Sequence, residues 1–144
     1  MSLTVTETKI KNVLPRTPGF LRTVTSHSLP PSPGRSNGNA LCGVGCYVRH
    51  NGHVLRGRPW GSFLEVRTNA ADSYLANFDR EARWARRDGG SFSIFCSSAT
   101  DPFVPQEQRC GVTRRLLASM LDRPPDELVV QTHSPLVTRE CDRL

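Results

Sequence analysis

The sequence of 144 residues lacks any long apolar run. No segment approaches the roughly 18 apolar residues that a membrane-spanning helix needs, and residues 1–11 contain no apolar stretch of the signal-peptide kind. These absences favour a cytoplasmic protein without a membrane partner. The chain has only five cysteines, an odd number, which disfavours a disulfide scaffold and favours reduced thiols or metal ligands.

Several catalytic signatures are also missing. The chain has no Gly-x-Gly-x-x-Gly, no phosphate-binding loop with a lysine, no nucleophile elbow and no His-Glu-x-x-His. These absences argue against the common dinucleotide-binding, P-loop, hydrolase and zinc-protease classes. The composition, 37% hydrophobic and 22% charged, predicts one ordinary globular domain over residues 1–144.

Positive charge is concentrated near the N-terminus. Residues 1–58 hold eight Lys/Arg against the single acid Glu7, a net charge of +7, whereas residues 59–144 hold eleven against twelve acids, a net −1. All basic residues except Lys9 and Lys11 are arginine, whose planar fork suits phosphate. Nucleic acid is therefore a candidate partner, and a solvated arginine-rich surface is the alternative.

Glycine and proline divide the chain near Trp60. We expect a loose terminus over residues 1–18, then a first strand at 20–25 and a loop-rich segment that extends to residue 61. Residues 62–144 alternate predicted strands with predicted helices. The strands are expected at 62–68, 92–98 and 128–132, the helices at 70–87 and 112–123, with Asn69 capping the first helix, Leu75 on its core face, and a short helix after Ser134 and Pro135.

This alternation indicates the α/β class with a parallel sheet. Ligands of such sheets bind at the carboxyl ends of the strands, and polar residues follow each predicted strand here. The candidates after the later strands are Ser97, Ser98, Thr100, Asp101, Thr132, His133 and Ser134. For Thr100 and Asp101 the alternative is a turn in which the aspartate accepts hydrogen bonds from local backbone amides.

Cys42 and Cys46 lie in a glycine-rich loop that could wrap around an inorganic group. His50 and His53 follow them, so these four side chains could hold zinc. The other interpretation is that both cysteines are ordinary loop residues.

Two parts of the chain resemble the radical S-adenosylmethionine (SAM) enzymes, in particular spore photoproduct lyase and the DNA repair photolyase-like group. The more specific part is residues 96–107 (CSSATDPFVPQE), similar to the Thr-Asp-Pro-Tyr-x-Pro-x-Glu segment of that group. The other segments are residues 19–21 (GFL), 25–31 (TSHSLPP), 46–47 (CY), 113–114 (TR), 131–134 (QTHS) and 138–139 (TR).

The resemblance implies a partial TIM-like barrel and a [4Fe-4S] cluster that cleaves SAM reductively, with electrons from a donor such as a flavodoxin or ferredoxin. It implies that Cys42 and Cys46 bind the cluster. It also implies that Ser97, Ser98, Thr100 and Asp101 bind the methionyl amino group, and that Thr132 and Ser134 contact the SAM carboxylate or ribose. The family pattern Cys-x3-Cys-x2-Cys is incomplete, because Arg49 stands at the third position and arginine cannot bind iron. His50, Cys96 and Cys110 are the candidate substitutes.

The similar region corresponds to only the first half of a radical SAM core, about three βα units. We therefore expect a fragment that needs a second chain to complete the barrel, with DNA-repair chemistry as the related activity. The alternative is an inactive remnant or a zinc- or nucleic-acid-binding module.

Overall fold

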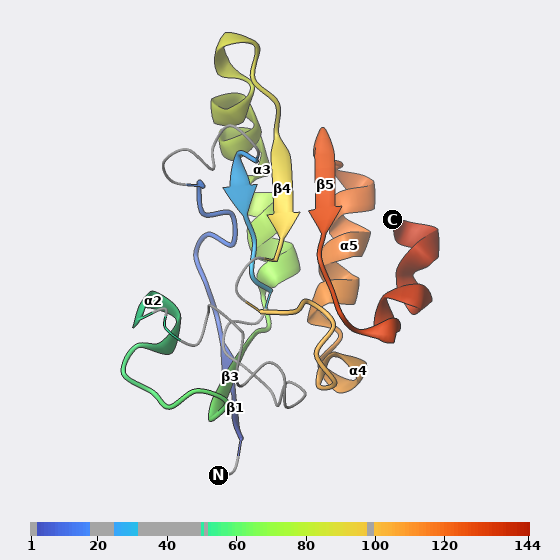
Figure 1. Ribbon diagram of the computed structural model, residues 1–144. Coiled ribbons are helices and arrows are strands. Elements are labelled where there is room, and N and C mark those ends of the chain that lie inside the picture. The colour runs from blue at the N-terminus through green and yellow to red at the C-terminus, as the bar shows by residue number, and fades with distance from the viewer. Residues whose placement is uncertain (1–2, 18–24, 32–49, 51, 98–99) are drawn as a thin grey trace.

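The computed structural model describes residues 3–17, 25–31, 50, 52–97 and 100–144 (Figure 1). The strands of this part are β1 (Thr4–Thr8), β2 (His27–Ser28), β3 (Phe63–Arg67), β4 (Ser93–Cys96) and β5 (Glu127–Val130). The α-helices are α2 (Gly52–Leu55), α3 (Ala70–Ala85), α4 (Glu107–Cys110) and α5 (Val112–Asp122), and the 3-10 helices are η3 (Arg87–Gly89) and η4 (Pro135–Arg143). No helix in these described ranges is long and apolar enough to cross a membrane.

The α/β class with parallel strands is confirmed. Strands β3 and β4 and helices α3 and α5 lie within the ranges predicted from the sequence, and β5 begins one residue before its predicted range and ends two residues before it does. Ser134 caps η4 as expected, because its side chain accepts a hydrogen bond from the backbone N–H of Leu136. Of the predicted first strand at 20–25, only Thr25 lies in the described part of the chain, and it is not in a strand.

The described strands form two small parallel sheets rather than one. In the first, β2, β4 and β5 lie in that order, and in the second β1 pairs with β3. The strand predicted at 62–68 is thus correct, but the expectation that it joins β4 in one sheet is wrong. Helix α3 precedes β4 and helix α5 connects β4 to β5, and both helices pack against the three-stranded sheet (Figure 1).

The expectation of a loose N-terminus is wrong for residues 4–17. Strand β1 pairs along its whole length with β3, from Thr4 opposite Phe63 to Thr8 opposite Arg67. Beyond it, Val13 and Leu14 are fully buried. The pairing satisfies backbone groups that β3 would otherwise leave open, which is why this polar segment forms a strand.

Asn69 stands at the N-cap position of α3 as the sequence predicts, but its side chain makes no capping hydrogen bond. Its side-chain oxygen instead accepts a hydrogen bond from the Ile10 N–H at 2.9 Å, and its amide nitrogen donates to the Ile10 carbonyl at 2.8 Å. Both backbone polar groups of one distant residue are satisfied in this way, so Asn69 anchors the N-terminal segment to the start of α3.

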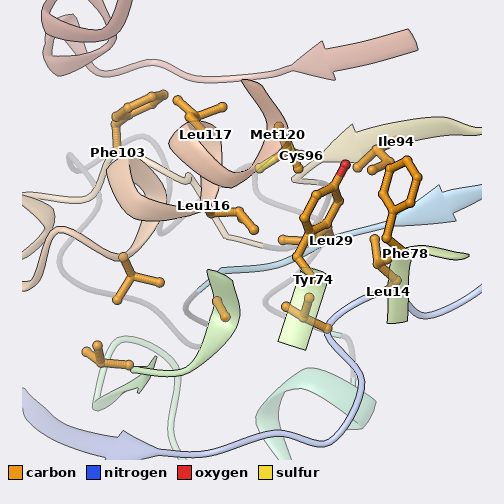
Figure 2. Close-up of a cluster of buried hydrophobic side chains, with 14 of the residues drawn as sticks. Leu14, Leu29, Tyr74, Phe78, Ile94, Cys96, Phe103, Leu116, Leu117 and Met120 are labelled. Carbon is orange, nitrogen blue, oxygen red and sulfur yellow. The ribbon is translucent and has the colours of Figure 1, made fainter. Parts of the chain in front are cut away.

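The core lies between the two helices and the three-stranded sheet (Figure 2). Helix α3 contributes Tyr74, Phe78 and Ala82, which lie four residues apart on one face. Leu75 was predicted on this core face, but that prediction is wrong, because Leu75 is 39% exposed. The Tyr74 hydroxyl donates to the Arg123 carbonyl at 2.6 Å, and burial raises the pKa of this phenol above its ordinary value.

Two leucines of α5, one buried and one exposed, provide a matched test of this core. Leu116 is fully buried and Leu121 is 57% exposed. We expect Leu116→Ala to lower the free energy of unfolding by about 2–5 kcal/mol, because it leaves a cavity, and Leu121→Ala to lower it by less than about 1 kcal/mol. Urea denaturation followed by circular dichroism measures both, and equal losses would contradict the described packing.

Candidate functional site at the carboxyl ends of the strands

Strands β4 and β5 end side by side. Cys96 pairs with Val130 at the last position of the ladder, and the Gln131 N–H donates to the Cys96 carbonyl at 2.9 Å. The loops that follow the two strands contain the polar residues predicted from the sequence. Parallel strands thus bring these loops to one edge of the sheet, as expected for an α/β ligand site.

Asp101 joins the two loops. Its Oδ1 accepts hydrogen bonds from the Thr132 hydroxyl at 2.6 Å and from the Phe103 N–H at 2.8 Å, and its Oδ2 accepts from the His133 N–H at 2.7 Å. The Thr132 hydroxyl oxygen also accepts from the Ser134 N–H at 3.0 Å. We call Asp101, Thr132, His133 and Ser134 the strand-end cluster.

The structure therefore brings Asp101, Thr132 and Ser134 together, three of the predicted ligand-binding residues. The hydrogen bond from Phe103 also agrees with the local turn that was the alternative for Asp101. The two interpretations are compatible, because Oδ2 accepts a bond from one described group and a carboxylate oxygen can accept two.

Ser97 and Thr100 are buried, whereas His133 of the strand-end cluster is exposed. Ser97 and Thr100 are 5% and 4% exposed, and the Thr100 N–H lies 3.4 Å from the Ser97 hydroxyl oxygen. Ser98 lies outside the described residues. Burial of Ser97 and Thr100 suits support of the loop more than direct contact with a large ligand.

Glu107, another acid of this segment, holds the start of α5. Its carboxylate accepts hydrogen bonds from the N–H groups of Val112 and Arg114, both at 3.1 Å. Burial raises the pKa of Glu107, against the lowering effect of these backbone donors. The Thr113 hydroxyl donates to the Pro102 carbonyl at 2.5 Å. Residues 101–107 thus shape the connection between β4 and α5 through these hydrogen bonds.

The proposed cluster ligands Cys42 and Cys46 lie outside the described residues. Of the suggested substitutes, Cys96 is buried, and burial raises the pKa of its thiol to about 12, with the nearby charges of Asp101 and Glu107 adding to the effect. Burial therefore keeps Cys96 a neutral thiol in the folded chain. Burial raises the pKa of Cys110 too, while His50 and His53 are exposed. Within the described ranges no three His, Cys, Asp or Glu side chains form a group that could hold a metal.

Arg67, the last residue of β3, is a half-buried charged residue that the sequence did not single out. Its guanidinium donates to the Pro30 carbonyl at 3.1 Å, and burial lowers its pKa from the ordinary value. An arginine at the end of a strand is the only signal that could have indicated it.

A buried polar network lies away from the strand-end cluster and was also missed. His27 Nε2 lies 2.9 Å from Glu81 Oε2, and His27 Nδ1 lies 2.8 Å from the Ser26 hydroxyl. The exposed fractions are 7% for Ser26, 0% for His27 and 2% for Glu81, so no substrate can reach this serine, histidine and acid. The network joins β2 to α3 and is structural.

The three cationic or polar partners of Glu81 keep its carboxylate ionised. Burial would raise its pKa, yet hydrogen bonds from Arg16, His27 and Arg80 lower it to about 2. Burial lowers the pKa of His27 and outweighs the opposing effect of Glu81. The described network is therefore a neutral imidazole beside a carboxylate.

These shifts predict how stability depends on pH. The folded pKa of Glu81 lies below its ordinary 4.5, so its contribution is present above that pH and is lost as pH falls toward 2. His27 adds a further loss of stability as the pH falls below 6.5, its ordinary pKa, because its imidazole binds a proton more readily in the unfolded chain than in the folded one. We expect Glu81→Gln to lower the stability near pH 7 and to flatten its decline between about pH 5 and pH 2.

Chemical denaturation at several pH values tests this expectation, with Glu127→Gln at the exposed first residue of β5 as the control. A Glu81→Gln protein with the wild-type pH dependence would contradict the assignment of an ionised Glu81.

Comparison of the chain with protein-family models, with curated proteins and with solved structures finds no significant match.

Proposed function

We propose that this chain contains the first strands of a radical SAM-type core and binds the amino-acid portion of SAM at the strand-end cluster. The observation that supports this most is that Asp101 joins the loops after two adjacent parallel strands. The order of β2, β4 and β5, with α3 and α5 before the second and third strands, is compatible with the first strands of a partial barrel.

The chemistry of the strand-end cluster suits an amino acid. An ammonium group needs oxygen acceptors, and Asp101 Oδ2 retains acceptor capacity beside the hydroxyls of Thr132 and Ser134. The backbone is held by hydrogen bonds before any ligand arrives, which reduces the entropy lost on binding. When bound, SAM would supply the group that is cleaved, and this chain's residues would bind and orient its methionyl end.

The residues present do not provide a complete set of ligands for a [4Fe-4S] cluster. Such a cluster needs three thiolates here, whereas the loop offers Cys42 and Cys46, and Cys96 is buried as a neutral thiol. We therefore derive no chemical step through the cluster. Cys42 and Cys46 stay as its two proposed protein ligands.

Thr132 provides a sharp test of SAM binding. Replacement by valine keeps the shape but removes the hydroxyl that donates to Asp101 and accepts from Ser134. We expect Thr132→Val to weaken SAM binding at least about tenfold, since each lost hydrogen bond to a charged group costs about 1.5–3 kcal/mol.

Isothermal titration calorimetry of the full chain with SAM measures this loss. The control is Thr138→Val on η4, an exposed threonine whose hydroxyl donates to the Pro135 carbonyl. Equal affinity of wild type and Thr132→Val, or no binding by wild type, would contradict the proposal.

Iron and sulfide content tests the two proposed cluster ligands separately. A cluster held by Cys42, Cys46 and a substitute third ligand would give about four irons and four sulfides per anaerobically purified chain, and Cys46→Ala would lose them. Retention of iron by Cys46→Ala, or an iron-free wild type, would contradict the assignment. Activity would in addition need an electron donor such as a flavodoxin or ferredoxin.

The shortage of thiolates supports a second candidate, a non-catalytic module. In that case Cys42, Cys46, His50 and His53 would hold zinc, or the chain would bind nucleic acid without cleaving SAM. Stoichiometric zinc in the same metal measurement would favour this alternative.

A further inference from the structure

Arginine side chains gather around one tryptophan at the C-terminal end of α3. We call Arg16, Arg80, Arg83, Trp84 and Arg87 the arginine face. On α3 and the turn after it, Arg80, Arg83, Trp84 and Arg87 are spaced i, i+3, i+4 and i+7, so they share one side of the helix within about two turns. Arg16 reaches the same place from the N-terminal segment.

Two guanidinium groups lie over the Trp84 ring. The central carbon of Arg16 lies 4.2 Å from the ring centroid and that of Arg87 lies 5.3 Å away. The same ring meets the edge of buried His27 at 5.5 Å, so Trp84 is supported from within the protein. A flat arginine held against a ring presents a planar, positively charged surface outward.

Glu81 fixes two members of the arginine face. Its carboxylate accepts from Arg16 Nε at 2.9 Å and from Arg80 Nε at 3.0 Å, although the Glu81 side chain is only 2% exposed. Arg16 and Arg80 themselves are 42% and 60% exposed. The arginines are thus oriented from below by a buried acid while their outer edges face solvent.

Positive charge remains after these pairs are counted. Arg16, Arg80, Arg83, Arg86 and Arg87 oppose Glu81, Asp88 and Asp126, which leaves a formal +2, and Arg86 is already paired with Asp126. Arg83 and Arg87 form no ion pair with any residue in the described part of the chain. These two exposed arginines are available to an anionic partner.

We infer that the arginine face binds single-stranded nucleic acid. Exposed guanidinium groups at helical spacing can neutralise successive phosphates, and the arginines stacked on Trp84 offer flat surfaces for unpaired bases. An acidic protein partner would pair with the charges of these arginines but would have no bases to stack on the guanidinium groups over Trp84. The arginine face lies at the end of α3 next to the start of β4, whereas the strand-end cluster lies beyond the opposite ends of β4 and β5 (Figure 1). The two sites are therefore separate.

Fluorescence anisotropy of a labelled 20-nucleotide single-stranded DNA with the full chain tests the inference. We expect Arg83→Ala/Arg87→Ala to weaken binding at least about tenfold at 50 mM salt and to reduce the slope of log K against log salt by about 0.7 for each arginine. The matched control is Arg109→Ala/Arg139→Ala, which removes two exposed arginines on α4 and η4. The control should bind within about twofold of wild type.

Several results would overturn the inference. They are no binding by the wild type, equal losses in both double variants, and competition by poly-glutamate or by duplex DNA as strong as that by the unlabelled single strand. A second readout uses Trp60→Phe, which leaves Trp84 as the only tryptophan of the chain. Its fluorescence should be quenched on DNA binding, and unchanged Trp84 fluorescence at saturating DNA would place the contact elsewhere.

Discussion

The buried carboxylate of Glu81 is the interaction on which much of the described structure depends. It is 2% exposed and accepts hydrogen bonds from Arg16 in the N-terminal segment, from His27 on β2 and from Arg80 on α3. A buried charge is tolerated only when it is paired on several sides. Glu81 therefore fixes the N-terminal segment, the first strand of the main sheet and its principal helix relative to one another.

Asp101 plays the corresponding role at the other end of the strands. It joins the loop after β4 to the loop after β5, and Glu107 fixes the start of α5 nearby. Asp101 and Glu107 accept most of their hydrogen bonds from backbone N–H groups of these loops and of the start of α5. The loops at the edge where a ligand is proposed to bind are therefore held in place by the protein itself. The two carboxylate centres lie at opposite ends of the same sheet and support two separate proposed sites.

Apolar periodicity was enough to predict α3, α5 and the strands around them, because apolar residues such as Phe78 and Ala82 on α3 recur at helical spacing, although Leu75 lies off the core face. It could not predict that β1 pairs with β3, since the polar sequence of β1 has no apolar face and its partner lies about 60 residues away. The strand-end residues were found from their position after strands. The sequence alone also groups Arg83, Trp84 and Arg87 on one helix face, but Arg16 joins them only in the fold.

The central claim is that the strand-end cluster binds the amino-acid portion of SAM. The most direct measurement is the change in backbone amide chemical shifts of the isotopically labelled full chain during titration with SAM. The account predicts saturable changes centred on Thr100, Asp101, Phe103 and residues 131–136, with the end of α3 unaffected. Changes confined to other regions, or no changes at saturating SAM, would contradict it.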